Sequence, residues 1–138
     1  QLFINLYPTS KRVKEATAFM DELRDKLAYK AYLNAKMYYD LGSYLGNNYL
    51  SAVITARNTL DDFPDTKYRE ELYFLILDAK YKEAVNSVEA KKDERLRDTL
   101  DEYYSFINEY PESAYLSNAN KIFQDINKLL KSTTSSNQ

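Results

Sequence analysis

Three pairs of adjacent carboxylates are the residues in this sequence best suited to acid–base chemistry. The pairs are Asp61-Asp62, Glu70-Glu71 and Asp101-Glu102. Two carboxylates act together as acid and base only when both reach one substrate. Adjacent positions on a helix diverge by about 100°, so these pairs predict solvated helix faces and no catalytic site.

The composition removes other kinds of chemistry. The chain of 138 residues contains no cysteine and no histidine, which excludes disulfides, thiol nucleophiles, imidazole bases and the commonest zinc ligands. Its 19 basic and 21 acidic residues give a net charge of −2, which is not the electrostatic signature of a nucleic-acid-binding protein. We therefore expect no enzyme, no cofactor, no metal site and no nucleic-acid partner.

Three copies of one short motif organise the chain. Each copy combines an aromatic residue, a proline and then a hydroxyl residue, in the stretches 3–10, 60–66 and 106–113. Proline cannot continue a helix, and a serine or threonine can bond the free N–H groups of the next one. The motif therefore predicts a helix end, a turn and a helix start, and its recurrence predicts a repeat array.

Apolar residues at spacings of three and four predict about five main helices, one of them unusually long. The expected ranges are 10–44, 48–63, 66–88, 93–110 and 114–131. Residues 1–7 are expected to end a helix of a preceding repeat, so the sequence is interpreted as the C-terminal part of a longer protein. The domain is expected to span 1–131, with a charged loop at 89–97 and a disordered tail at 132–138.

The repeats resemble a stretched tetratricopeptide pattern. Tyr49, Ala52 and Pro64 have the spacing of its second helix, but the three prolines lie further apart than its period of about 34 residues. Because glycine and proline are scarce, we expect the added length in longer first helices. The predicted fold is thus an all-α solenoid resembling tetratricopeptide repeats, and a plain antiparallel helical bundle is the alternative.

The order of the motifs also resembles one family. Its most specific part is the run Leu23, Leu27-Ala28, Ala35 and Tyr38-Tyr39, followed by Phe63-Pro64-Asp65-Thr66. Over residues 1 to about 84 the chain is similar to the C-terminal half of the BamD family, and the remainder resembles versions with an extra terminal repeat.

This resemblance implies a non-enzymatic scaffold in the assembly of outer-membrane β-barrel proteins. Family members are lipid-anchored at the periplasmic face of the outer membrane, and here the anchor would lie outside the given sequence. They dock on a periplasmic POTRA domain of the barrel subunit BamA, and unfolded outer-membrane proteins are further candidate partners. An arginine that takes part in this docking corresponds to Thr55 here, and Arg57 is the nearest basic residue.

The resemblance therefore suggests a partner-binding face on the helix expected at 48–63. Its residues are Thr55, Arg57, Asn58 and Asp62, and a merely solvated face is the alternative. Four tyrosines that the apolar stripes do not explain are candidates for a surface groove, namely Tyr29, Tyr73, Tyr81 and Tyr115.

Two rival functions share this fold. One is a periplasmic adaptor of the same repeat type for cell-envelope synthesis or division. The other is a helical glycan-binding lipoprotein, which would need long loops with exposed aromatic residues.

Overall fold

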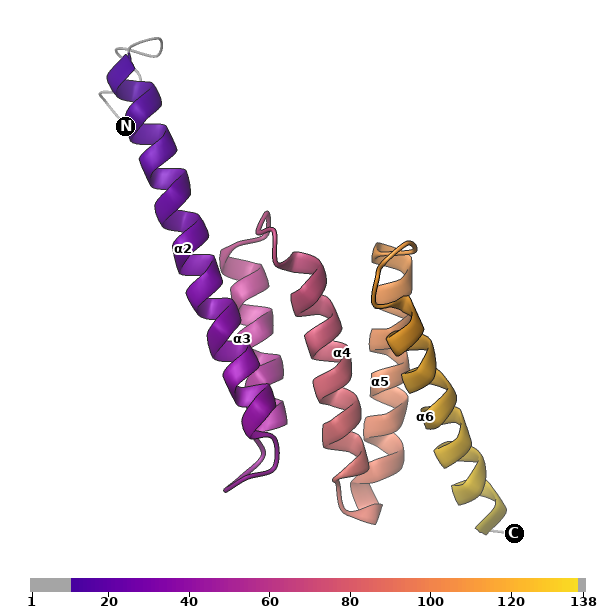
Figure 1. Cartoon of the computed structure of the whole chain (residues 1–138). Coiled ribbons are helices and arrows are strands. Elements are labelled where there is room, and N and C mark those ends of the chain that lie inside the picture. Colours follow the sequence, from indigo (N-terminus) through magenta and orange to yellow (C-terminus); the bar gives the residue numbers. More distant parts are fainter. Residues whose placement is uncertain (1–10, 137–138) are drawn as a thin grey trace.

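The computed structural model describes residues 11–136, which form five α-helices and no strand (Figure 1). They are α2 (Lys11–Leu41), α3 (Asn48–Asp62), α4 (Arg69–Val85), α5 (Glu89–Glu109) and α6 (Leu116–Ser136). The helix end expected at residues 1–7 and the first proline motif lie outside the described residues.

The helices stack in consecutive pairs. Each helix packs on the next, and α4 also contacts both α2 and α6, so the first helices of successive pairs lie side by side (Figure 1). This is the packing pattern of a repeat stack, because each unit contacts its neighbours in sequence. The prediction of an all-α fold resembling tetratricopeptide repeats is confirmed, and the plain bundle is not the arrangement observed.

Two apolar clusters hold the stack together, and α4 takes part in both. Leu72 and Ile76 belong to a cluster with residues of α2 and α3, whereas Leu77 and Ala84 belong to a cluster with α5 and α6. All four of these side chains are completely buried. Since a helix with apolar residues on several sides must be enclosed, the sequence of α4 places it at the centre.

The two described proline motifs separate successive helices as predicted, but their hydroxyls bond the residue before each helix and not an N–H within it, and α4 has no side-chain cap. The hydroxyl oxygen of Thr66 accepts a hydrogen bond from the N–H of Tyr68 at 3.2 Å, and that of Ser113 accepts one from Tyr115 at 3.0 Å. Helices α4 and α6 each begin three residues after the hydroxyl. The repeated sequence motif therefore produces a repeated corner, with each hydroxyl bonding the segment that leads into the next helix.

The loop predicted at 89–97 is wrong, because α5 begins at Glu89 and the connection from α4 consists of residues 86–88. The charged residues pair at helical spacing instead of avoiding the helix. Lys92 contacts Glu89 one turn away at 4.0 Å, and Glu89 itself favours the positive N-terminal end of the helix dipole.

Because α5 begins at Glu89, the extra length of the second repeat lies in its second helix and not in its first. The first pair follows the prediction, with 31 residues in α2 and 15 in α3. In the second pair α4 has 17 residues and α5 has 21, so the second helix is the longer one. The expectation of longer first helices is therefore right for α2 and wrong for α4.

The tail predicted to be disordered from residue 132 is helical as far as Ser136. The hydroxyls of Thr133 and Thr134 donate hydrogen bonds to the carbonyls of Leu129 and Leu130, each at 3.0 Å. These two leucines pack on the second apolar cluster, so the last turn continues from an anchored one. The boundary of the domain at residue 131 stays a prediction.

The apolar stripe predicted along α2 is buried only in its second half. Ala35 is completely buried, whereas Met20, Leu23 and Leu27 are 59%, 48% and 49% exposed. Figure 1 shows the first turns of α2 extending beyond α3, and Arg24 already contacts the end of α3 through the carbonyl of Asp62. Hydropathy excludes each of the described helices as a membrane-spanning segment.

Candidate partner-binding groove

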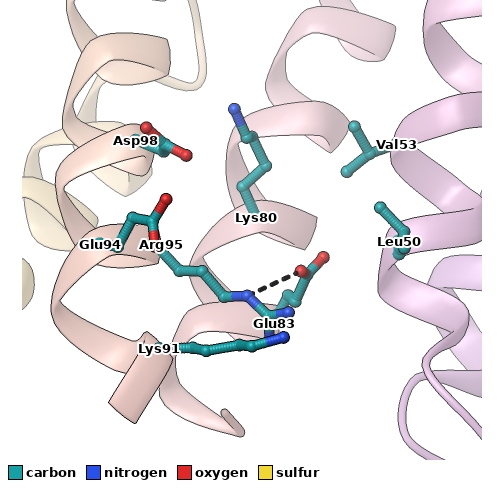
Figure 2. Close-up of a pocket in the computed structure, with 8 residues that line it drawn as sticks. All are labelled: Leu50, Val53, Lys80, Glu83, Lys91, Glu94, Arg95 and Asp98. Carbon is teal, nitrogen blue, oxygen red and sulfur yellow. Dashed lines mark ion pairs between the residues drawn. The ribbon is translucent and has the colours of Figure 1, made fainter. Parts of the chain in front are cut away.

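A groove of about 360 Å³ opens between α3 and α5, above α4, and we call it the α3–α5 groove (Figure 2). One wall is apolar and consists of Leu50 and Val53 of α3. The floor and the opposite wall are charged, with Lys80 and Glu83 from α4 and Lys91, Glu94, Arg95 and Asp98 from α5.

Helical spacing explains why these side chains face one another. Lys91, Glu94 and Asp98 follow one another at intervals of three and four, which places them along one side of α5. Leu50 and Val53 share a side of α3 for the same reason. The groove is therefore a consequence of two facing helices whose sides differ in polarity.

An ion pair closes the floor of the groove. Glu83 of α4 contacts Nε of Arg95 of α5 at 3.5 Å (Figure 2), and another nitrogen of Arg95 donates to the hydroxyl of Ser87 at 2.6 Å. The Glu83 side chain is only 14% exposed. This pair and the hydroxyl fix the guanidinium group against α4, so Arg95 is already engaged by the chain itself.

Glu102 joins three helices near the groove. Its carboxylate accepts hydrogen bonds from Arg57 of α3 and from Lys80 of α4, the latter at 3.2 Å. Glu102 is 14% exposed, and Lys80 is 25% exposed. One carboxylate thus pairs with two positive charges from different helices and links the two helix pairs.

Three charged residues of the groove remain without such partners. The side chains of Lys91, Glu94 and Asp98 make no ion pair or hydrogen bond with any residue of the described part of the chain, and all three residues are exposed. In Figure 2 Lys91 lies toward the α4–α5 connection, and Asp98 lies at the other end of the groove. The wall formed by α5 therefore presents one free positive charge followed by two free negative charges.

The structure separates the four residues of the predicted partner face. Arg57 points toward α5, where it binds Glu102. Thr55, Asn58 and Asp62, spaced by three and four residues, lie on a different side of α3. Asn58 and Asp62 are exposed, and Thr55 is partly buried.

Two residues of that face, Thr55 and Asp62, accept hydrogen bonds through their main-chain carbonyls only. The carbonyl of Thr55 accepts a hydrogen bond from the Thr59 hydroxyl at 2.7 Å. The carbonyl of Asp62 accepts one from Arg24 of α2 at 3.1 Å. Because both bonds use main-chain oxygens, they leave the side chains of this face available.

Sequence reasoning missed the residues that define the α5 wall, and also the role of Glu102 beside it. The adjacent acids Asp101-Glu102 predict a solvated face, and the charged stretch 89–97 predicts a loop. The recurrence of charged residues at positions 91, 94, 98 and 102 was the available signal, because intervals of three and four residues are typical of one helix side.

Of the four tyrosines predicted for a surface groove, three are partly buried against the second cluster. Tyr115 stacks on Phe74 with ring centroids 4.7 Å apart, and Tyr73 lies under the guanidinium of Arg69 at 4.9 Å. Only Tyr29 among the four is exposed, at 45%. Tyr81 also lines a shallow pocket together with Phe74 and Asp78. The prediction that one or more of the four line a surface groove is therefore confirmed for Tyr81, and packing accounts for the burial of three.

A polar contact between α2 and α4 involves a tyrosine with a perturbed pKa. The hydroxyl of Tyr39 donates to Asp78 at 2.5 Å, and Lys82 donates to the same hydroxyl. Burial and the bond to Asp78 raise the pKa of Tyr39 well above its ordinary value. The neutral phenol therefore acts as a structural link between α2 and α4.

No cluster of residues suited to a metal ion occurs among residues 11–134.

Together, the stacked pairs and the open groove define a helical repeat protein with surfaces suited to binding other macromolecules. Residues 41–134 match the sequence profile of the YfiO family, described as outer membrane lipoprotein. The match covers more than half of the chain, and the chain belongs to this family. The matched region continues beyond residue 84, whereas residues 1–40 lie outside the match. A search of curated proteins finds no significant match to the chain.

Proposed function

We propose that this chain is a non-enzymatic scaffold subunit of the machinery that assembles β-barrel proteins in the bacterial outer membrane. Its membership in the outer membrane lipoprotein family is the observation that carries this proposal. The stack of rigid helix pairs supports it further, because such stacks present extended surfaces for binding. The protein would act at the periplasmic face of the membrane, held by a lipid anchor outside the given sequence.

The proposed partner is a POTRA domain of the barrel-forming subunit, and the proposed contact is the outer face of α3. Thr55, Asn58 and Asp62 share this face, and their side chains make no ion pair within the described residues. Arg57 is a less suitable contact, because its charge is already paired with Glu102. Its proposed part is to fix α3 against α5, so that the outer face keeps its orientation.

The test measures binding of the full chain to the purified POTRA domains of the barrel subunit from the same bacterium. The double variant Thr55→Glu, Asn58→Glu places two charges on the proposed face and is expected to weaken binding by about tenfold or more. Asn108→Glu, an exposed asparagine on α5, is the control and is expected to bind like the wild type.

The result separates the proposal from its rivals. If the wild-type chain does not bind POTRA domains, the assembly role is wrong and an adaptor for envelope synthesis or division takes its place. If binding occurs but the double variant and the control behave alike, the assembly role stands and the α3 face is wrong.

A further inference from the structure

We propose that the α3–α5 groove binds an amphipathic segment of a partner protein that carries one acidic and two basic residues beside an apolar side. This site is separate from the outer face of α3 and does not depend on which face meets a POTRA domain. The observations behind it are the two unlike walls of the groove and the three free charges on α5.

The apolar wall supplies the first half of the recognition. Leu50 is 45% exposed although it lines a groove, and Ile54, one turn further along α3, is 51% exposed. Val53 is nearly buried beneath them. Covering such side chains with apolar groups of a partner is favourable, at about 25 cal/mol per Å² of apolar surface.

The charged wall supplies the second half. Glu94 and Asp98 lie one turn apart, and neither has a cation from the described residues within ion-pair distance. The cations beside them are already engaged, since Arg95 is bound to Glu83 and Lys80 to Glu102. The free charges on this wall therefore favour a partner with basic side chains at Glu94 and Asp98 and an acidic one at Lys91.

The size of the groove limits how the partner enters. A volume of about 360 Å³ is at the lower end for ligand pockets and admits side chains, not a whole helix. The segment would therefore lie across the opening as a helix, with its apolar side chains against Leu50 and its charges facing α5. The order of charges on α5 fixes the direction of the segment.

A synthetic helical peptide provides the probe. It carries a glutamate, then lysines three and seven residues later, matching the spacing of Lys91, Glu94 and Asp98, and leucines on the adjoining side. Because the chain has no cysteine, an Ala90→Cys variant of the full chain carries one fluorophore on an exposed residue of α5 that neighbours Lys91 but does not line the groove. Its signal on titration reports binding, and the variants described next show whether that binding occurs in the groove.

Three comparisons decide the proposal. Glu94→Lys with Asp98→Lys is expected to weaken binding by about tenfold or more, since two ion pairs become repulsions. Asp21→Lys with Asp25→Lys is the matched control, because these exposed carboxylates have the same spacing on α2. A peptide with inverted charges is expected to bind poorly to the wild type and to regain affinity for the Glu94→Lys, Asp98→Lys variant.

Several outcomes would overturn the proposal. They are no binding to the wild type, equal weakening by the control variant, and equal affinity of the two peptides. Sedimentation of the unlabelled chain tests a further occupant. A dimer that the Glu94→Lys, Asp98→Lys variant abolishes would show that a second copy of the chain fills the groove. Retained helical content, measured by circular dichroism, confirms that the exposed substitutions leave the fold intact.

Discussion

Individual residues of this protein acquire their roles from partners distant in the sequence. Glu102 is 45 residues from Arg57 and 22 from Lys80, yet it binds both. Nothing local to Glu102 reveals these contacts, because the packing of α3, α4 and α5 creates them. This explains why the sequence predicted a solvated carboxylate here.

Tyr39 provides a test of a polar contact at the residue scale. Tyr39→Phe removes the bond to Asp78 and is expected to lower the free energy of unfolding by about 1 kcal/mol at neutral pH. Because the pKa of Tyr39 is raised in the folded state, its contribution is complete below pH 10.0, its ordinary pKa, and is lost as the pH rises further. Urea unfolding from about pH 7 to 11 measures both effects.

Comparing Tyr39→Phe with the wild type separates the contribution of Tyr39 to the pH dependence of stability from that of other tyrosines. Tyr32, Tyr81 and Tyr115 also have raised pKa values, chiefly through burial, so wild-type stability should fall above pH 10.0 for several reasons. The fall should be smaller in Tyr39→Phe. Tyr44→Phe, at a residue that is 67% exposed, should behave like the wild type. Identical pH profiles for Tyr39→Phe and the wild type would contradict the assigned role.

At the scale of elements, local chemistry accounts for what was predictable. The corners at Pro64 and Pro111 follow from neighbouring residues, and so do the apolar stripes that face the core. Composition alone does not predict the start of α5, because residues 89–97 suit both a solvated loop and a charged helix side, and only the spacing of the charges at 91, 94 and 98 indicates a helix. The contact between Arg95 and Glu83 of α4 favours the helix, and that contact exists only after packing.

The α2–α3 turn tests how closely elements approach each other. Gly42 has φ +58°, and a Cβ at this position would lie 2.6 Å from the hydroxyl oxygen of Tyr49. Gly42→Ala is therefore expected to lower the free energy of unfolding by about 2–3 kcal/mol, from backbone strain and the clash together. Chemical denaturation measures this cost.

A Tyr49→Phe background distinguishes the two contributions to that cost. Removing the hydroxyl removes the nearest atom, so Gly42→Ala should be less destabilising there than in the wild type. Equal costs in both backgrounds would mean that the hydroxyl adds nothing to the cost, leaving the backbone conformation and the ring carbon Cζ at 2.9 Å.

At the scale of the whole molecule, the stack was predictable because the same sequence motif recurs. The groove between α3 and α5 was not, since it depends on how two non-consecutive helices face each other across α4. Leu50 illustrates the difference, because its helix was predictable while its position in the wall of a groove was not. Sequence periodicity predicts the helices, whereas predicting a groove between helices requires knowing how they pack.

The stack should lose stability in stages. Ile126 of α6 is completely buried in the second cluster, so Ile126→Ala is expected to destabilise the region around it by about 2–5 kcal/mol. In a stack with neighbour contacts this effect declines with distance. Hydrogen exchange measured by mass spectrometry should therefore rise most in α5 and α6 and least in α3.

The matched control is Ile54→Ala on α3, where the side chain is 51% exposed and little change in exchange is expected. An equal rise in all five helices after Ile126→Ala would instead indicate a single cooperative unit.

The double membership of α4 in both apolar clusters has a mechanical consequence. Because Leu72 packs in one cluster and Leu77 in the other, we expect this helix to move with both neighbours and not to act as a hinge. Bending of the stack would then be distributed over the side chains of both clusters that pack on α4. We therefore expect a force applied to one end of the stack to change its curvature, without rotating one half of the molecule against the other.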